Sequence, residues 1–333
     1  MTEIHPSRRS LIKGAGGLGA ALALGGAGVV AAAGTANAAT VADGFGLRLI
    51  DHNEDHPRLK YYRVKTAEIG WPTGPGINVL LPDGYATSGL RYPVLYLFHG
   101  GGPGLDFTQW DWIVPYTAGL PMIIVMPDGG QVGWHSNPVS SFVGPRNWES
   151  FHMNQLVPWI DANFRTHAEF AGRAVCGFSM GGFGALKYGA KYYGHFASVS
   201  SHSGPASMRR NFGAAGHWAN ATSAAIDLAG GTIYGVPFWD QARVSADNAV
   251  ENVERYRGKR VYLVAGNGTQ DILADFKGFT ENQVLQGHQE FSALLTHAGI
   301  PHQQFSEQGG HVIRFQRIMT DFQEIVAHLR PAS

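Results

Sequence analysis

Short apolar runs recur along the chain beyond residue 70 and predict buried strands. Most of them are rich in branched and aromatic residues, and several are apolar at consecutive positions rather than at every second one. Such runs are typical of strands that helices cover on both faces. We expect strands at residues 76–81, 93–98, 121–126, 174–176, 196–200 and 261–265, with a short last strand at 303–306.

Stretches with helical periodicity alternate with these runs. They lie at residues 149–164, 182–193, 281–298 and 312–329. Strands that alternate with helices predict an α/β fold with a mostly parallel central sheet and helices on both faces. Residues 204–258 interrupt the alternation, because they are rich in Gly, Ala, Trp and Asn and show little periodicity. We expect them to form an irregular, cap-like excursion over the strand ends rather than a second domain.

The first 38 residues have the pattern of an export signal. A twin arginine, Arg8-Arg9, precedes an uncharged Gly/Ala/Leu/Val run, and Ala36-Asn37-Ala38 supplies small residues for cleavage. This order predicts a twin-arginine signal peptide that is removed, which leaves residues 39–333 as a single catalytic domain. A retained membrane anchor is the alternative. We therefore expect the twin-arginine export machinery as a partner and a location outside the cell or in its envelope.

Composition excludes some functions. The chain is 44% hydrophobic and 15% charged, and its formal net charge is zero. A basic surface for nucleic acid is therefore not expected. The single cysteine, Cys176, lies in an apolar run and is expected to be a buried core residue rather than a nucleophile.

A serine among glycines is the strongest chemical signal. Residues 177–181 read GFSMG and follow a predicted strand just before a predicted helix. In that context G-x-S-x-G predicts a strained turn that exposes the hydroxyl of Ser179 as a nucleophile. The N–H of Met180, at the start of the helix, would then stabilise a developing oxyanion.

The nucleophile needs a base and an acid. Of 15 histidines, His311 follows two glycines after the last predicted strand, so we expect it to be the base. Three other histidines, at positions 297, 302 and 328, are the weaker alternatives. The acid is expected after the preceding strand, at Asp271, with Asp275 as the alternative.

A second oxyanion donor and a substrate wall can also be predicted. Residues 99–102 read HGGG after a strand, so the N–H of Gly101, or else of Gly102, is the expected donor, and His99 is expected to be structural. Four aromatic residues either line an acyl or aryl pocket or pack in the core: Trp134, Trp218, Phe238 and Trp239. No metal-ligand pattern such as H-E-x-x-H occurs, so neither a metal nor another cofactor is expected.

Several segments together resemble one family. They read LYLFHGGGPGLDFTQWDW (95–112), DGGQVGWHSNP (128–138), WESFHMNQLVPWIDANF (148–164), GFSMGGFGALKYGAKYYGHFASVSSHSG (177–204), GNGTQD (266–271) and GGH (309–311). The chain resembles the esterase family of the α/β-hydrolases, which includes esterase D-like enzymes and secreted mycolyltransferases. The resemblance implies the α/β-hydrolase fold, serine hydrolase chemistry, and oxyanion donors at Gly101 and Met180.

The chain also departs from the mycolyltransferases. Their Asp and Arg that hold the trehalose acceptor correspond to His99 and Gly102, so the resemblance implies no trehalose site. Their acidic residue is a Glu at the position of Ile272, whereas Asp271 matches the Asp of the wider esterase group.

These features predict a secreted serine hydrolase that cleaves carboxylic esters through an acyl-enzyme on Ser179. The expected substrate is a small-molecule, lipid or sugar ester. An acyltransferase that passes the acyl group to a sugar or lipid alcohol is the first alternative, because it would use the same triad. A non-catalytic cell-surface binding protein is the second, and a peptidase is a weaker third.

Overall fold

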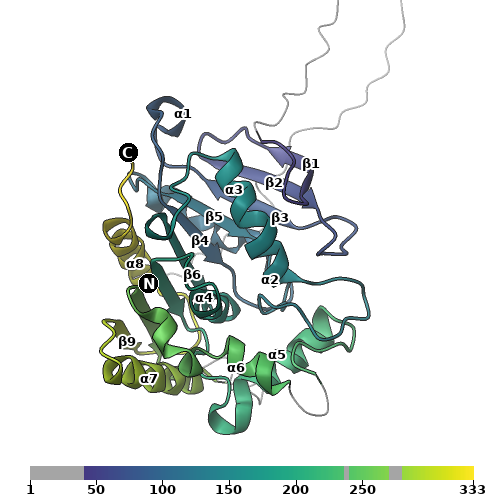
Figure 1. The fold of residues 1–333 in the computed structure, drawn as a ribbon, viewed down its shortest axis with the longest axis vertical. Coiled ribbons are helices and arrows are strands. Elements are labelled where there is room, and N and C mark those ends of the chain that lie inside the picture. Colours follow the sequence, from purple (N-terminus) through teal and green to yellow (C-terminus); the bar gives the residue numbers. More distant parts are fainter. Residues whose placement is uncertain (1–40, 236–239, 270–279) are drawn as a thin grey trace, which may run out of the picture. The chain divides into compact units, whose positions relative to one another are not determined.

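The computed structural model describes residues 41–235, 240–269 and 280–333. The chain divides into two units, Met1–Ala38 and Ala39–Ser333, and the fold described below belongs to the second unit. This unit is built on one nine-stranded sheet (Figure 1). Its strands are β1 Arg48–Asn53, β2 Leu59–Lys65, β3 Gly76–Leu80, β4 Val94–Phe98, β5 Ile123–Pro127, β6 Arg173–Phe178, β7 Ser198–His202, β8 Arg260–Gly266 and β9 Gln303–Glu307.

The sheet is mostly parallel. Its strand order is β1-β2-β3-β5-β4-β6-β7-β8-β9. All pairings from β5 through to β9 are parallel, whereas β1, β2 and β3 pair in antiparallel fashion and β3 joins β5 in the same way. Because parallel strands end at one edge of a sheet, the loops that follow β4, β6, β8 and β9 come together there.

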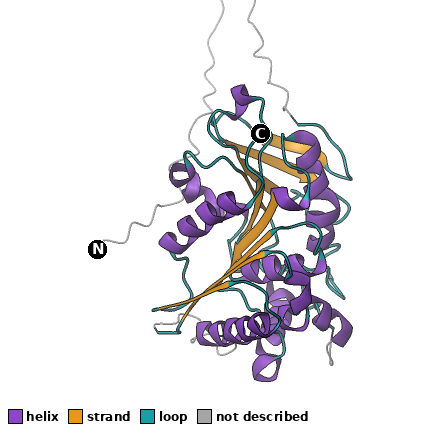
Figure 2. Cartoon of the chain, turned by 60° about the vertical axis from the view of Figure 1, so that its left-hand side comes forward, coloured by secondary structure: helices purple, strands orange, loops and turns teal. Residues whose placement is uncertain are grey.

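Helices cover both faces of the sheet, which forms one twisted layer between them (Figure 2). The longer helices are α3 Val157–Asn163, α4 Met180–Lys191, α5 Arg210–Ile226, α6 Gln241–Asp247, α7 Glu281–His297 and α8 Phe315–His328. The structure also contains two short helices, α1 Tyr85–Ser88 and α2 Trp148–Ser150. A 3-10 helix runs over Phe107–Thr117, and a π-helical stretch runs over Phe151–Leu156.

Strand β4 shows why its sequence is apolar throughout. Val94, Tyr96 and Phe98 pack in the core on one face, while Leu95 and Leu97 pack in the core on the other. All five side chains are buried. A strand with helices on both sides has no solvated face, so it needs no polar alternation. The prediction of a doubly covered, mostly parallel sheet is confirmed.

The predicted strands all form, but two further strands were missed. These are β1 and β2, at the antiparallel edge of the sheet. Their sequences, RLIDHN and LKYYRVK, carry charges, and only Tyr62 and Val64 of β2 are buried. Edge strands with one solvated face lack the continuous apolar run that identified the others.

The excursion over residues 204–258 is less irregular than its sequence predicts. It contains α5 and α6, two helices that the sequence analysis did not predict. Helix α5 buries small residues such as Ala215, Gly216 and Ala219. A face of small residues allows close packing, but it gives no stripe of large apolar side chains to read from the sequence.

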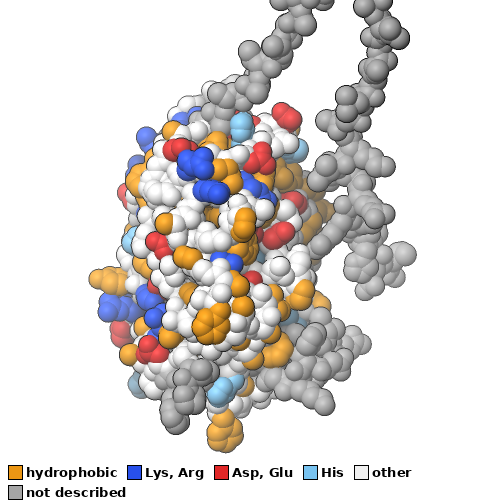
Figure 3. Space-filling model, turned by 90° about the vertical axis from the view of Figure 1, so that its right-hand side faces the viewer, with side chains coloured by type: hydrophobic (Ala, Val, Ile, Leu, Met, Phe, Trp, Pro, Cys, Tyr) orange, Lys and Arg blue, Asp and Glu red, His pale blue; other side chains and the backbone are white. Residues whose placement is uncertain are grey.

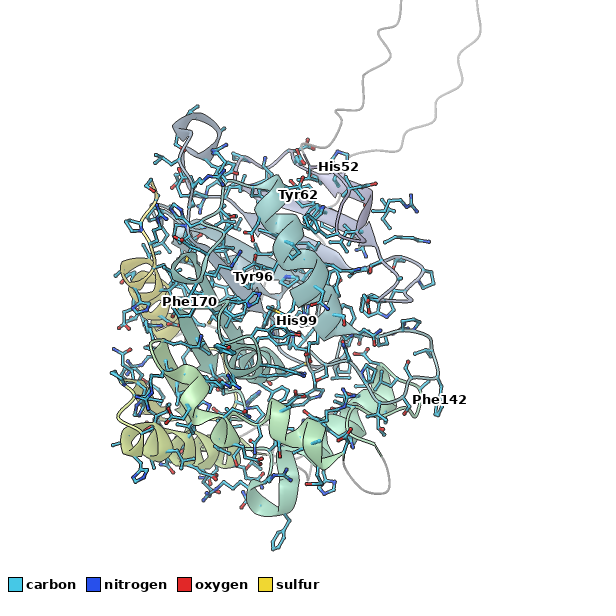
Figure 4. All side chains as sticks on the ribbon, in the orientation of Figure 1. His52, Tyr62, Tyr96, His99, Phe142 and Phe170 are labelled. Atoms are coloured by element: carbon cyan, nitrogen blue, oxygen red, sulfur yellow. The ribbon has the colours of Figure 1, made fainter. Side chains whose placement is uncertain are left out.

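The surface carries few charges, as the composition indicates. Figure 3 shows one face on which uncharged polar groups and scattered hydrophobic side chains cover most of the area. Phe142 projects outward from the loop between β5 and α2 (Figure 4), with 73% of its surface exposed. No helix in the described ranges is long and apolar enough to cross a membrane.

Candidate active site

Ser179 stands between β6 and α4, where the sequence analysis expected a nucleophile. Its backbone has φ 57° and ψ −120°, a strained conformation for a residue with a side chain. The peptide N–H of Ser179 donates to the carbonyl of His202 at the end of β7, at 2.8 Å. This bond ties the strained turn to the neighbouring strand, and the Ser179 side chain remains partly accessible to solvent.

The glycines around Ser179 make room for this turn. A Cβ on Gly177 would lie 2.3 Å from the carbonyl carbon of Gly181. A Cβ on Gly181 would lie 2.4 Å from the carbonyl oxygen of Phe98 on β4. Both distances are far below van der Waals contact, so only glycine allows the chain to fold back on itself here. The expectation that these glycines clear space for the serine is confirmed.

His311 reaches the serine from the loop between β9 and α8. Its Nε2 lies 2.7 Å from the hydroxyl oxygen of Ser179. The imidazole also packs against the ring of Phe178, with 4.9 Å between the ring centroids. A hydrogen bond of this length is the geometry that a general base needs to accept the serine proton. The structure thus brings together the serine and the histidine that the sequence predicted.

The acidic partner of His311 is Glu281, the first residue of α7. Its Oε2 lies 2.6 Å from Nδ1 of His311, and its side chain is fully buried. Asp271, the predicted acid, and Asp275, its alternative, lie outside the described residues. The ring nitrogen that Asp271 was expected to orient is thus hydrogen bonded to a different carboxylate. The structure thus places the Glu281 carboxylate on Nδ1 of His311, and the role of Asp271 stays a prediction.

The surroundings of Glu281 keep its carboxyl ionised. Burial would raise its pKa, but the hydrogen bond and positive charge of His311, the N–H of Gly266 and the hydroxyl of Ser203 together lower the pKa below its ordinary value. Gly266 and Ser203 both donate to Oε1, at 2.6 and 2.7 Å. The position of Glu281 at the N-terminus of a 17-residue helix favours negative charge as well.

An ionised Glu281 decides which nitrogen of His311 carries the proton. A carboxylate only accepts hydrogen bonds, so Nδ1 of His311 must donate to it. In a neutral imidazole the other nitrogen, Nε2, is then unprotonated and accepts from the Ser179 hydroxyl. The three side chains therefore hold the imidazole in the tautomer that removes a proton from serine.

Two backbone N–H groups beside Ser179 are available for an oxyanion. A Cβ on Gly101 would lie 3.3 Å from the Cβ of Met180, so the two residues are neighbours. Hydrogen bonds occupy the N–H groups of Gly100 and Gly102, which donate to Gln109 and Gln131. In the described part of the chain, no acceptor occupies the N–H groups of Gly101 and Met180. The geometry thus favours Gly101 over Gly102 as the second donor.

His99 has a structural position, as the sequence analysis expected. It lies in the interior of the fold (Figure 4) and is completely buried. Its Nε2 accepts the N–H of Gly129 at 2.9 Å, so its Nδ1 donates to the carbonyl of Gly100 at 2.8 Å. Burial lowers the pKa of His99, which keeps the ring neutral. His99 thus fixes the start of the loop that carries Gly101.

Two of the four predicted substrate-binding aromatics can be located. Trp134 is buried, and its backbone N–H donates to the sulfur of Met180 at 3.2 Å. Its indole N–H donates to the hydroxyl of Thr222 in α5, which ties the excursion to the loop that carries Trp134. Trp218, also in α5, is half-buried against the same apolar cluster. Phe238 and Trp239 lie outside the described residues.

A second histidine–carboxylate pair lies close to the site, in the interior of the fold. His202 donates from Nε2 to Asp321 in α8 at 2.9 Å, and Cys176 lies 3.6 Å from the same carboxylate oxygen. Arg260 holds the other oxygen of Asp321 at 2.8 Å. A cysteine, a histidine and an aspartate suit a metal in principle, but the arginine on this carboxylate leaves little reason for a second cation. Cys176 is confirmed as a buried core residue.

Glu281 and its partners were missed from the sequence for a physical reason. Several carboxylates follow β8 along the chain, and the spacing does not show which one reaches the histidine. One signal was available: Thr280-Glu-Asn-Gln283 forms a capping box that fixes the start of α7. An acidic residue at the start of the helix that follows β8 could have pointed to Glu281.

Comparison with known proteins identifies the family. The family model described as "Putative esterase" matches residues 68–324. The chain is 64% identical over 293 residues to "Esterase Rv1288" of Mycobacterium tuberculosis (strain ATCC 25618 / H37Rv). The aligned stretch covers 87% of this chain and 64% of that protein. The chain thus spans less than two thirds of the length of this relative.

Solved structures share the fold at low identity. An S-formylglutathione hydrolase from Agrobacterium tumefaciens matches with a TM-score of 0.65 and 14% identity, over 85% of this chain and 99% of that one. Mycobacterium tuberculosis MPT51 (FbpC1) matches with a TM-score of 0.63 and 18% identity, over 80% and 97%. With its parallel sheet and its serine turn after β6, the chain has the α/β-hydrolase fold and belongs to the esterase family.

Proposed function

We propose that this protein is a serine hydrolase that cleaves carboxylic esters, with Glu281 as the acid of its triad. The observation that carries the proposal is the continuous hydrogen-bonded chain from Glu281 through His311 to Ser179, with contacts of 2.6 and 2.7 Å. Membership in the esterase family and the similarity to "Esterase Rv1288" support the same reaction class.

In the first half of the reaction, Ser179 Oγ attacks the carbonyl carbon of the ester. Its proton moves to Nε2 of His311, and Glu281 stabilises the resulting imidazolium. The carbonyl oxygen becomes an oxyanion that accepts hydrogen bonds from the N–H groups of Gly101 and Met180. The C–O bond to the alcohol then breaks, and His311 returns the proton to the departing alkoxide. The alcohol leaves, and the acyl group stays on Ser179.

In the second half, water takes the place of the alcohol. His311 removes a proton from the water as it attacks the acyl carbon, and the same N–H groups stabilise the second oxyanion. The bond to Ser179 Oγ breaks, and the proton on His311 returns to the serine. A carboxylic acid leaves and the free enzyme is restored. Every proton is carried by His311, so the cycle needs no metal or cofactor.

The substrate is proposed to be a small-molecule, lipid or sugar ester whose acyl part contacts aromatic side chains. Trp134 touches Met180, the residue that supplies one oxyanion donor, and Trp218 packs against the same cluster. Phe238 and Trp239 complete the proposed set. An aromatic wall next to the oxyanion donors would favour apolar or aryl acyl groups over acetyl.

A hydrolysis panel tests the reaction class. We would compare wild-type protein with Ser179→Ala on p-nitrophenyl esters of increasing chain length, feruloyl esters and acetylated sugars. The substitution should lower kcat by at least about 10⁴-fold without changing the melting temperature, because it removes only the nucleophile. An organophosphate-type serine reagent should label wild type alone. Unlabelled wild-type protein without turnover would favour the non-catalytic binding protein instead.

Acyl transfer remains a second candidate because the acyl-enzyme is common to both reactions. The triad and the oxyanion donors do not discriminate between water and an alcohol as the second nucleophile. Counting the acid and ester products with and without added sugar or lipid alcohols would decide. A transferred ester that exceeds the free acid at millimolar acceptor would make the protein an acyltransferase.

We also propose that the protein is exported by the twin-arginine route. The support is the sequence of residues 1–38, with Arg8-Arg9 before an uncharged run. Replacing both arginines by lysine should retain the full-length protein in the cytoplasm, as measured by cell fractionation and mass determination of its N-terminus. Export of the double variant at the wild-type level would contradict the proposal.

A further inference from the structure

Arg314 is the N-cap residue of α8, and its side chain donates hydrogen bonds to the loop of His311 on both sides of the histidine. Its Nη2 donates to the carbonyl of Gly310 at 2.9 Å, and its Nη1 donates to the carbonyl of Val312 at 3.0 Å. These two peptide groups flank His311 in the chain. One planar guanidinium thus joins the residue before the histidine to the residue after it, in the fork geometry that arginine provides and lysine does not.

The same guanidinium lies against the acid. Its Nη1 is 3.8 Å from Oε1 of Glu281 and 3.5 Å from the hydroxyl of Ser203, and the Arg314 side chain is only 10% exposed. In the described ranges, Glu281 is the one carboxylate within 4.0 Å of this cation. The groups that face Arg314 are therefore His311 and its loop, the Glu281 carboxylate, the Ser203 hydroxyl and the end of β8.

The end of β8 is shaped to accept this side chain. A Cβ on Gly266 would lie 2.2 Å from Nη2 of Arg314, so a larger residue there would displace the guanidinium. The N–H of Gly266 also donates to Oε1 of Glu281. A single glycine thus serves both the carboxylate and the arginine, which indicates that the three groups form one built arrangement.

We infer that Arg314 is a positioning residue for the proposed hydrolysis, with two separable effects. It fixes the loop so that Nε2 of His311 stays 2.7 Å from Ser179 Oγ. Its positive charge also offsets part of the negative charge of Glu281, which limits how strongly the site favours the protonated imidazole. The inference rests on the proposed function, because both effects act through the triad.

Two substitutions separate geometry from charge. Arg314→Gln keeps hydrogen-bond donors but loses the charge and the second carbonyl bond, and Arg314→Lys keeps the charge but loses the fork. We expect Arg314→Gln to lower kcat by about 10- to 100-fold, since small misplacement of a catalytic group has effects of this size, with KM changed less than about 3-fold. The acid limb of its kcat/KM profile should move up by about half a pH unit, because an uncompensated Glu281 favours the imidazolium.

Arg314→Lys should lose kcat but keep the acid limb at the wild-type pH. Arg317→Gln is the matched control, because Arg317 lies three residues further on, in the first turn of α8, and pairs with Glu307. Among the described residues, Arg317 has no hydrogen bond or ion pair with Ser179, His311 or Glu281. This substitution should leave kcat and the pH profile unchanged. Rates are expressed per folded molecule from size-exclusion chromatography and near-UV circular dichroism. If Arg314→Gln does not fold, Arg314→Lys decides alone: wild-type kcat there overturns the inference.

Other outcomes also overturn it. If Arg314→Gln has the kcat and the acid limb of the wild type, Arg314 has no role in positioning. If the acid limb shifts equally in Arg314→Gln and Arg314→Lys, the charge of Arg314 has no role. Ser179→Ala is measured alongside. Turnover that survives Ser179→Ala would refute the proposed function itself, whereas an inactive Ser179→Ala with an unaffected Arg314→Gln would refute this inference alone.

Discussion

Two histidine–carboxylate pairs at neighbouring strands have very different roles. His311 pairs with Glu281 at 2.6 Å, and His202 pairs with Asp321 at 2.9 Å. Both carboxylates are fully buried and both receive additional hydrogen bonds. By the chemistry of the pair alone, either one could orient a general base.

The difference is in the remaining nitrogen of each ring. His311 offers Nε2 to the hydroxyl of Ser179, and its side chain is 10% exposed. In His202, Nε2 donates to Asp321, and the side chain is only 3% exposed. Its buried Nδ1 has no hydrogen-bond partner in the described part of the chain. Access to a nucleophile, rather than the presence of an acid–base pair, therefore separates the site from the core.

The surroundings of the two carboxylates differ in the same way. Asp321 is held by Arg260, Ser200 and His202, which join α8 to strands β7 and β8. This pair fastens a helix to the sheet. Glu281 is held by Gly266 at the end of β8, by Ser203 just after β7 and by the loop of His311, so its network positions that loop. A buried ionic network thus stabilises the fold in one case and orients reactive groups in the other.

The largest expected effect that tests this comparison is on activity. Glu281→Gln should lower kcat/KM by about 10³- to 10⁴-fold, because the neutral amide no longer stabilises the imidazolium or its tautomer. The melting temperature should change by only a few degrees. Glu281→Asp, which keeps the charge on a shorter side chain, is the matched control and should be less impaired. If Glu281→Gln retains more than a tenth of wild-type activity, another carboxylate is the acid.

Asp321→Asn should have the opposite profile. The neutral amide removes the negative charge that faces Arg260 and one of the two oxygens that accept from Arg260, Ser200 and His202, so the free energy of unfolding should fall by about 3–5 kcal/mol. Turnover per folded molecule should stay within about threefold of wild type. Urea unfolding and kcat on the same samples measure both. A stable variant with a large loss of kcat would reverse the roles assigned to the two pairs.

The pH dependence sharpens the same comparison. Burial would raise the pKa of Asp321, but the hydrogen bond from His202 and the charge of Arg260 lower the pKa below its ordinary value of 3.8. A lowered pKa means stability that is present above pH 3.8 and is lost as the pH falls through the folded-state value. The difference in unfolding free energy between wild type and Asp321→Asn should therefore be constant near neutral pH and shrink below about pH 4.

The smallest effect is expected at Cys176. Burial raises the pKa of its thiol, so it stays protonated and unreactive in the native protein. Cys176→Ala should lower the free energy of unfolding by about 1 kcal/mol and leave kcat unchanged. Thiol reagents should not inhibit the native wild type. Inhibition that disappears in Cys176→Ala would show that this interior cluster is open to reagents.

Local features of the chain could be predicted well. The strained turn at Ser179, the glycines beside it and the strand before it lie within a few consecutive residues, so neighbouring positions determine the conformation. The loop of His311 follows the same logic, because glycines precede it at the end of β9. The apolar runs of the covered strands were equally clear, since burial on both faces leaves no polar alternation.

Features that join distant segments could not be predicted. Glu281 lies 30 residues from His311 along the chain, and several carboxylates share the segment after β8. Arg314 shows no motif, because its role depends on carbonyl groups and on a carboxylate from another element. The helices of the excursion pack through small residues, and the edge strands keep a solvated face, so neither shows a strong apolar pattern.

The sequence by itself determined the fold class and predicted the serine turn, the histidine loop and the glycine loop beside them, because each depends on backbone conformation over a short stretch. Only the tertiary structure decided which carboxylate orients His311 and which histidine–carboxylate pair faces a hydroxyl. Those choices depend on distances of a few ångströms between side chains from different elements, and spacing along the chain does not fix such distances. The packing of α7 and α8 against the sheet fixes these distances.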